Sequence, residues 1–195
     1  MSAAGFAAVV LAAGAGTRFG EPKAVAPLRP GVRFVDAVVE AALAAGASPV
    51  LVVGAPGLAV PAGARLVPNP HALGEQIASL RLGLARLANT AAAGALAWPV
   101  DHPFVRAETA RALAERALAA GASVALPVHA GRRGHPAWFA RATWRELMTV
   151  AEGGARAVVR AYGAAVLEVP VDDAGVLRDV DTRADLACGL EAEER

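Results

Sequence analysis

The sequence predicts an α/β protein, a Rossmann-like three-layer sandwich in which helices cover both faces of a mostly parallel sheet. Composition is the first reason: 55% of the 195 residues are hydrophobic and 19% are charged, which is typical of a globular domain with a full-sized core. The second is order, because short apolar runs alternate with segments of helical spacing through the first two thirds of the chain. The third is the position of the glycines, which follow the ends of several of these segments and indicate turns there.

The first two thirds of the chain support this prediction element by element. The run 6–13 is apolar throughout, as expected of a strand covered on both faces, and glycines follow it. The segment 34–45 has its apolar residues on one face, and Gly46 closes the helix. The further elements expected in order are strands at 49–54 and 65–68, a helix at 76–87, a strand at 94–100, a helix at 107–120 and a strand at 123–128. Right-handed crossovers between these strands then produce a parallel sheet.

The last third is less regular. Short strands are expected at 136–139, after a glycine- and arginine-rich turn, and at 165–169, with a turn at 172–175. Helices are expected at 143–150, 155–162 and 182–189, the last of them capped by Thr182. We therefore predict a single domain, 1–195.

Charge and cysteine content exclude several classes of protein. The formal net charge is +1 and the arginines form no basic run, so we expect no nucleic-acid partner. Residues 1–13 lack the positive start of a signal peptide, and no apolar run is long enough to cross a bilayer. Cys188 is the single cysteine, so it has no partner for an internal disulfide, and we expect it to be a packing residue. A cytoplasmic protein with no membrane contact is predicted.

The most informative segment is the loop 14–23, Gly-Ala-Gly-Thr-Arg-Phe-Gly-Glu-Pro-Lys, which follows the first strand. Its glycines allow the backbone to approach a ligand closely, and successive N–H groups can then form an anion nest. Arg18 offers a planar fork and Lys23 a point charge, and both suit phosphate oxygens. Phe19, between them, is expected to pack in the core. The loop therefore favours a nucleoside triphosphate as ligand, with solvated surface charge as the simpler alternative.

Two common nucleotide-binding motifs do not fit this loop. The dinucleotide fingerprint has two residues before its last glycine, whereas three separate Gly16 from Gly20. It also needs an acidic residue after the second strand, where this chain has Val-Val-Gly-Ala. The P-loop requires Gly-Lys-Ser/Thr, whereas Lys23 lies between a proline and an alanine. An NAD-dependent oxidoreductase and a P-loop protein are therefore both disfavoured.

The pattern that fits is L-A-A-G-x-G-x-R-x-G-x-x-K, and with it the chain resembles the MobA-like nucleotidyltransferase family, above all its molybdenum-cofactor cytidylyltransferases. The resemblance covers nearly the whole chain because later segments follow in the family's order. These are Gly-Glu-Gln-Ile-Ala-Ser-Leu-Arg-Leu-Gly at 74–83, Val-Asp-His-Pro at 100–103, Gly-His-Pro at 134–136, and Asp-Val-Asp-Thr at 179–182 with Asp185 and Leu186 after it. The implied fold is that of the nucleotide-diphospho-sugar transferases. The resemblance also implies that the single domain 1–195 has a nucleotide-binding half at 1–105 and an acceptor-binding half at 106–195.

This resemblance implies a role for each matching residue. The implied catalytic residues are Arg18, Lys23 and Asp101. Mg²⁺ would be held by Asp101 and Asp181, with Asp179 as a weaker candidate. The implied nucleotide-binding residues are Leu11, Ala12, Ala13, Gly14, Gly16, Thr17, Arg18, Lys23 and Ser79, and the implied acceptor-binding residues are Arg133 and His135. The residues alone leave simpler alternatives open: an N-cap or turn aspartate at 101 and at 181, a small helix residue at 79 and a structural histidine at 135.

The implied reaction is the transfer of CMP from CTP, or of GMP from GTP as the nearest variant, to the phosphate of molybdopterin, with release of pyrophosphate. An acceptor phosphate is already ionised at pH 7, so no strong general base is needed. Two departures from the family pattern bear on the acceptor and the base: His102 stands where the family usually has Gln, and Lys23 is followed by Ala-Val-Ala-Pro-Leu-Arg-Pro-Gly instead of an uninterrupted x-L-L-P-L-x-G. The alternatives are a nucleotidylyltransferase acting on a sugar phosphate or another small phosphate, and a non-catalytic nucleotide-binding chaperone of a molybdoenzyme.

Overall fold

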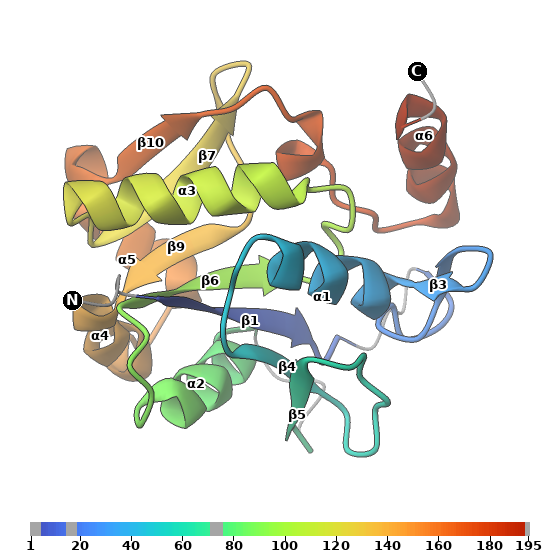
Figure 1. The fold of residues 1–195 in the computed structure, drawn as a ribbon, viewed down its shortest axis with the longest axis horizontal. Helices are drawn as coiled ribbons and strands as arrows, with labels where there is room; N and C mark the ends of the chain where they lie inside the picture. Colours follow the sequence, from blue (N-terminus) through green and yellow to red (C-terminus); the bar gives the residue numbers. More distant parts are fainter. Residues whose placement is uncertain (1–4, 15–18, 71–75, 194–195) are drawn as a thin grey trace.

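One eight-stranded sheet forms the centre of the molecule (Figure 1). The computed structural model describes residues 5–14, 19–70 and 76–193. The strands of the sheet are β1 (Phe6–Ala12), β4 (Val50–Gly54), β5 (Ala64–Pro68), β6 (Gly94–Pro99), β7 (Val124–His129), β8 (Arg132–Arg133), β9 (Ala137–Ala140) and β10 (Leu167–Pro170). Their order across the sheet is β10-β7-β9-β6-β1-β4-β5, and β8 pairs with β7. A separate antiparallel ribbon consists of β2 (Pro27–Arg29) and β3 (Val32–Arg33).

The sheet is mostly parallel, as predicted. The central strand β1 runs parallel to both of its neighbours, so that Val10 lies opposite Val52 of β4 and Trp98 of β6. The pairs β4–β5 and β7–β10 are parallel too. The exceptions are β9, which runs antiparallel between β6 and β7, and the short β8, which pairs antiparallel with β7. Because β1 and β6 are parallel neighbours, the loops after both strands emerge at the same edge of the sheet, where ligands of open α/β sheets bind.

Helices cover both faces of the sheet and create two apolar layers. On one face lie α1 (Phe34–Ala44) and α3 (Ala107–Ala120); on the other lie α2 (Gln76–Leu87), α4 (Trp144–Thr149) and α5 (Gly154–Tyr162). The side chains of β1 alternate between these layers: Val10 packs in the layer under α1 and α3, and Val9 in the layer under α2. A side chain at Gly83 would meet Val9 at 2.4 Å, so a glycine at this position allows α2 to lie directly on β1.

Most expected elements are present within one or two residues of their predicted bounds, and α2 and α3 match them. Three short strands were not predicted: β2, β3 and β8, the last inside the segment expected to be a turn. The final helix, α6 (Arg183–Glu193), continues beyond its predicted end at 189. The prediction for Cys188 was wrong, because this residue is exposed: α6 lies at the edge of the molecule and packs on it through Leu186 and Leu190.

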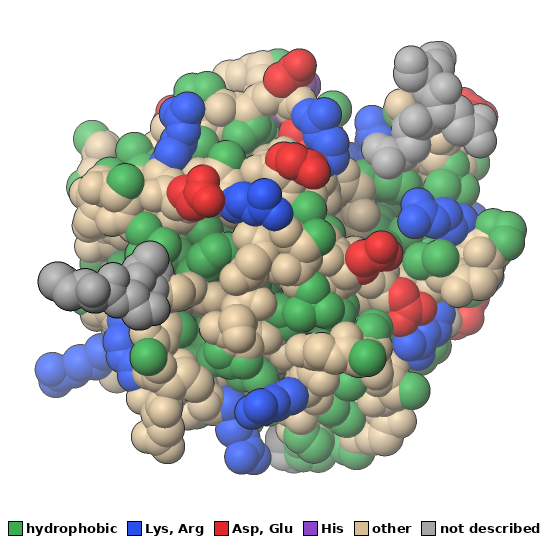
Figure 2. Space-filling model, viewed as in Figure 1, with side chains coloured by type: hydrophobic (Ala, Val, Ile, Leu, Met, Phe, Trp, Pro, Cys, Tyr) green, Lys and Arg blue, Asp and Glu red, His purple; other side chains and the backbone are tan. Residues whose placement is uncertain are grey.

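On the face drawn in Figure 2, acidic and basic side chains are interspersed over α1 and α3 instead of gathered by sign. No helix in the described part of the chain is long and apolar enough to span a membrane.

Candidate active site

A cluster of charged side chains lies where the loops after β1 and β6 meet. Lys23, from the loop after β1, places its Nζ 2.5 Å from Oδ1 of Asp181 and 3.7 Å from Oδ2 of Asp101. The lysine side chain is only 12% exposed. Lys23 and Asp181 are 158 residues apart in the chain. The structure thus brings together three residues that the family resemblance had singled out from three separate segments.

Backbone hydrogen bonds fix the positions of the two aspartates relative to each other. Asp101 follows β6, and its carbonyl oxygen accepts a hydrogen bond from the N–H of Val180, with an N–O distance of 2.9 Å. Val180 is fully buried, so the segment that carries Asp181 is anchored on the end of β6. These carboxylates therefore converge because one strand end holds the other segment in place.

The loop that carries Lys23 is anchored on the first turn of α1. The N–H of Val35 donates to the carbonyl of Ala24, and the N–H of Phe34 donates to the carbonyl of Ala26. Both alanines are buried against this helix start, which gives a packing reason for the small residues that follow Lys23. The expectation for Phe19 is confirmed: it is 3% exposed and packs edge-on against Phe34, with ring centroids 5.4 Å apart.

His102 orients the carboxylate of Asp101. Its Nδ1 lies 2.9 Å from Oδ1 of Asp101, while the indole N–H of Trp98 donates to the carbonyl of His102 at 3.1 Å. Burial raises the pKa of Asp101, but the hydrogen bond from His102 and the charges of His102, Lys23 and His135 outweigh it, so the pKa lies below its usual value. The histidine that departs from the family pattern is thus a direct partner of the predicted metal ligand.

The start of α6 does not use Asp181 as its cap. Thr182 and Asp185 form a reciprocal cap instead, as predicted for Thr182: Asp185 Oδ2 accepts from the N–H of Thr182 at 2.7 Å, and Thr182 Oγ1 accepts from the N–H of Asp185 at 3.2 Å. The hydrogen bonds from the side chain and backbone of Thr182 lower the pKa of Asp185. This geometry disfavours the N-cap interpretation of Asp181. Asp179 is exposed, and none of the ion pairs between described residues involves it.

The two carboxylates form a set that fits a magnesium ion. Asp101 and Asp181 already converge on one cation, the Lys23 ammonium, so a divalent ion could take the same place if Lys23 moved toward a bound phosphate. Within the described residues, no group of three or more His, Cys, Asp or Glu side chains could hold a metal. Phosphate oxygens and water would therefore have to complete the coordination, which is how Mg²⁺ is usually held at nucleotide sites.

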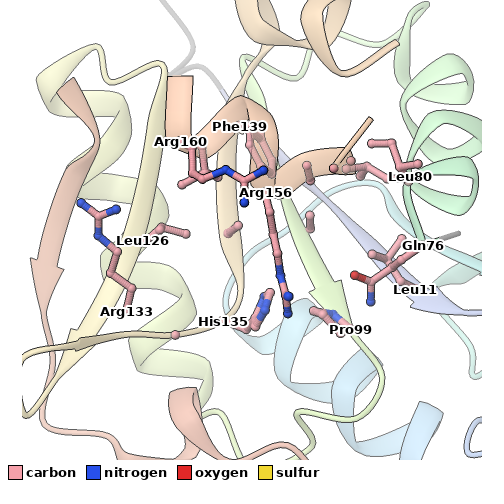
Figure 3. Close-up of a pocket in the computed structure, with 18 residues that line it drawn as sticks. Leu11, Gln76, Leu80, Pro99, Leu126, Arg133, His135, Phe139, Arg156 and Arg160 are labelled. Atoms are coloured by element: carbon pink, nitrogen blue, oxygen red, sulfur yellow. The ribbon is translucent and has the colours of Figure 1, made fainter. Parts of the chain in front are cut away.

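A cavity of about 580 Å³ lies beside this charge cluster (Figure 3). Its floor comes from the ends of β1, β6 and β9, and α2 and α5 close its sides. Leu11, His135 and Arg133 line it, as do three basic or amide residues that the sequence analysis did not single out: Gln76, Arg156 and Arg160. In the sequence, the two arginines were recognisable only as a pair four residues apart on a predicted helix that follows two glycines. An ordinary solvent-exposed helix face has the same pattern.

The remaining predicted residues have varied positions. Ala12 and Ala13 are buried at the end of β1, and Gly14 is exposed. Ser79 is buried in α2, where its Oγ accepts a hydrogen bond from Nδ2 of Asn69 at 3.0 Å, and it is not among the residues lining the cavity. Arg133 donates to Oε1 of Glu168 at 2.7 Å. The predicted residues Gly16, Thr17 and Arg18 lie outside the described residues.

Similar solved structures cover the whole fold. Rv0371c from Mycobacterium tuberculosis H37Rv is 29% identical, and the alignment covers 98% of this chain and 100% of its own, with a TM-score of 0.81. A crystal structure of Rv0371c in complex with manganese aligns at 25% identity over 97% of this chain and 100% of its own, with a TM-score of 0.75. A nucleotidyl transferase from Methanothermobacter is 25% identical over 96% and 98%, with a TM-score of 0.76. The 2-C-methyl-D-erythritol 4-phosphate cytidylyltransferase from Thermus thermophilus, at 21% identity over 98% and 100% and a TM-score of 0.73, shares the fold.

A comparison with protein-family profiles assigns the chain to a family. The curated protein sequences contain no significant match. The MobA-like NTP transferase domain, however, matches residues 8–166, a span that includes most of β1, the loop after it, Asp101 and the cavity-lining arginines. Together with the α/β fold, the mostly parallel sheet and the nucleotidyltransferase structures that align with nearly the whole chain, this match shows that the protein belongs to the MobA-like NTP transferase family and is a nucleotidyltransferase.

Proposed function

We propose that this protein transfers CMP from CTP, with GMP from GTP as the nearest variant, to the phosphate of molybdopterin and releases pyrophosphate, in a magnesium-dependent reaction. The observation that carries the proposal is the convergence of Asp101 and Asp181 on Lys23 at the ends of parallel strands. Two carboxylates and a lysine suit a metal–triphosphate complex, in which the ion is bound by the carboxylates and the lysine by phosphate oxygens. A purely structural ion pair would not need the second carboxylate.

The residues of the charge cluster would act by position and charge. Magnesium held by Asp101 and Asp181 would neutralise charge on the α-phosphate and the incoming oxygen. Lys23 would move from the carboxylates to the phosphates and stabilise the charge that grows on the leaving pyrophosphate, together with Arg18 of the same loop. His102 would keep the Asp101 carboxylate oriented through its hydrogen bond. No covalent enzyme intermediate is required.

The histidine beside the cluster is suited to a neutral role. Burial, the charge of His102 and the charge of Arg156 lower the pKa of His135 to about 4, against the opposing effect of Asp101. The imidazole is therefore uncharged at pH 7 and a weak base. This agrees with an acceptor phosphate that is already ionised and needs no proton removed before it attacks.

The choice of molybdopterin as acceptor rests on the sequence resemblance and on the cavity beside Asp101. Gly-His-Pro at 134–136 is the segment that resembles the family on the acceptor side. The cavity of about 580 Å³ lies within the range for a small-molecule ligand of this size. Both the His135 ring and Arg133 line this cavity, which supports the predicted acceptor contacts.

The test is pyrophosphate release by the full chain with each of the four nucleoside triphosphates, Mg²⁺ and molybdopterin. We expect release with CTP or GTP that depends on both the acceptor and the metal. Release that requires a sugar phosphate instead would overturn the acceptor. Magnesium-dependent nucleotide binding without release with any acceptor would support the non-catalytic chaperone and overturn the transferase role.

A further inference from the structure

Two arginines of the cavity have no counter-charge among the described residues. Arg156 and Arg160 lie one turn apart on α5, and both line the cavity (Figure 3). Within the described part of the chain, neither guanidinium takes part in a hydrogen bond or an ion pair, and no residue that lines the cavity is acidic. Like charges at this helical spacing repel each other, so the pair slightly destabilises the helix that carries it. A bound anion would remove that repulsion.

The position of Arg156 connects this pair to the charge cluster. Its side chain extends from α5 toward His135 in Figure 3, and its charge is one of those that lower the pKa of His135. The His135 ring in turn lies 4.5 Å from the ring of His102, the partner of Asp101. Arg156 therefore lies on the opposite side of the two histidines from Asp101. Arg160 lies one turn farther along α5.

The start of α5 adds to the positive character of the side of the cavity that α5 forms. Gly153 and Gly154 both line the cavity and both have positive φ angles, 72° and 55°. The first N–H groups of a helix have no partner inside the helix and favour a negative charge nearby. Arg81 of α2 donates to the carbonyls of Leu147 and Val150, which holds the end of α4, just before this turn, on α2. Arg156 thus projects from the first turn of an anchored helix, and Arg160 from its last turn.

The rest of the cavity is apolar. Its lining includes Leu11, Ile77, Leu80, Leu126, Phe139 and Val159. Gln76 is the one neutral polar side chain besides His135 among the described residues of the lining. The hydroxyl groups of a sugar would lose their hydrogen bonds to water here and find few replacements, which disfavours binding. A ring or alkyl group would instead gain from the apolar contact.

We propose that Arg156 and Arg160 form the anion subsite of the acceptor pocket, and that this pocket takes a phosphate monoester that carries a planar ring in preference to a sugar phosphate. Arg156 binds the acceptor phosphate, and Arg160 binds a negative or polar group nearer the opening. The inference rests on the proposed nucleotidylyl transfer for what the bound phosphate does next. Binding itself is tested without turnover.

The experiment is isothermal titration calorimetry of the full chain, with the nucleotide site first saturated by Mg²⁺ and the non-hydrolysable α,β-methylene analogue of CTP. Phenyl phosphate and glucose 1-phosphate are then the probes. We expect phenyl phosphate to bind at least about ten times more tightly than glucose 1-phosphate, since the difference in apolar burial alone corresponds to more than about 1.4 kcal/mol. Equal affinity for the two probes, or tighter binding of the sugar phosphate, would overturn the proposal.

Variants assign the effect to the arginines. Arg156→Ala should weaken phenyl phosphate binding about tenfold or more, Arg160→Ala less, and Arg156→Lys should restore part of the loss. Arg145→Ala, on the exposed side of α4 and outside the cavity lining, is the matched control and should bind like the wild type. Unchanged phenyl phosphate affinity in Arg156→Ala would overturn the subsite.

The two proposals fail in different ways. Affinity of the CTP analogue should be the same in all four variants, because the charge cluster is untouched. If the arginine-dependent difference in phenyl phosphate binding is found but no triphosphate releases pyrophosphate with any acceptor, the transfer function falls and the anion subsite stands. If pyrophosphate is released but Arg156→Ala leaves the KM for the acceptor unchanged, the subsite falls and the transfer function stands.

Discussion

The charge cluster and the neighbouring cavity differ in how their charges are balanced. In the cluster, the one lysine of the sequence lies between two carboxylates, and a histidine holds one of these carboxylates in place. In the cavity, Arg156 and Arg160 have no acidic partner among the described residues, and most of the surrounding surface is apolar. The charges of the cluster are therefore balanced without a ligand, whereas the cavity gains its charge balance only when an anion enters.

This difference indicates that the cluster and the cavity have different roles, the first in the chemical step and the second in binding the acceptor. The backbone fixes Asp101 and Asp181 relative to each other before a ligand binds, and this suits chemistry because the carboxylates need not rearrange when charge develops in the transition state. An unbalanced and apolar cavity suits selection, because the free energy of binding comes from the ligand's own charge and surface. We therefore expect changes in the cluster to affect turnover most and changes in the cavity to affect acceptor affinity most. The predictions below test this contrast.

The largest expected effect is that of Asp101→Asn. The change keeps the size of the side chain but removes the charge that would hold the metal, so kcat should fall about 10³-fold or more while the protein stays folded. The measurement is pyrophosphate release at saturating triphosphate and acceptor, with circular dichroism as the check on folding. Asp172→Asn, an exposed aspartate, is the matched control and should keep wild-type activity. Near-normal turnover in Asp101→Asn would contradict the metal assignment.

Lys23→Ala should have the next largest effect. Without the ammonium, the triphosphate loses a charged contact and Asp101 and Asp181 repel each other, so kcat/KM for the triphosphate should fall about 10²-fold. Because the chain has no other lysine, amine-directed labelling followed by mass spectrometry reports on Lys23 and the chain's N-terminal amine alone. Triphosphate with Mg²⁺ should protect Lys23 from the label, whereas phenyl phosphate should not. Protection by phenyl phosphate alone would mean that the cluster and the cavity are not separate sites.

A smaller effect concerns stability and pH. The pKa of His135 is lowered from 6.5 to about 4, so between these pH values the unfolded chain binds a proton that the folded protein does not. Stability should therefore decrease as the pH falls through this window, by about 1–2 kcal/mol between pH 7 and pH 5 from this one group. In His135→Gln that part of the decrease should disappear. Urea unfolding of both proteins at the two pH values measures it, and parallel decreases would show that His135 is not held neutral.

The smallest effect is expected for Thr182→Ala, which removes one side chain of the cap at the start of α6. The loss should be about 1 kcal/mol in the free energy of unfolding, the usual cost of a lost N-cap. Because Asp181 directly precedes the cap, we also expect a modest rise in the metal concentration needed for half-maximal activity. Thr182→Ser, which keeps the hydroxyl group, should restore both quantities. If stability falls and metal dependence does not change, the cap supports the helix alone.

The sequence predicted the fold well because its signals are local. The apolar run at 6–13 and the helical spacing at 76–87 each lie within a short window, and both elements formed where expected. The ribbon of β2 and β3 was missed because strands of two or three residues leave no periodicity to detect. Cys188 was placed wrongly because its burial depends on which side of α6 faces the body of the protein. The apolar and polar residues of α6 are not separated into two clear faces, so the sequence does not specify that side.

The candidate site was predicted in part for the same reason. Lys23, Asp101 and Asp181 could be named because each lies in a segment that resembles a family motif, and the structure places them together. Nothing in those segments indicated that His102 would orient Asp101, or that Arg156 and Arg160 would face the same cavity as His135. An arginine on a helix surface has the same local pattern whether a cavity or bulk solvent lies in front of it.

By itself, then, the sequence determined the order of strands and helices, the glycine-rich loop after the first strand and the chemical types available at the strand ends. These properties depend on spacing within a few residues, where backbone geometry and apolar periodicity act directly. Only the tertiary structure decided that β9 runs antiparallel, that a lysine and an aspartate 158 residues apart are in contact, and that two arginines face an apolar cavity beside them. Such contacts follow from how the sheet is assembled and how its faces are covered, because long-range packing, rather than local preference, sets which distant side chains meet.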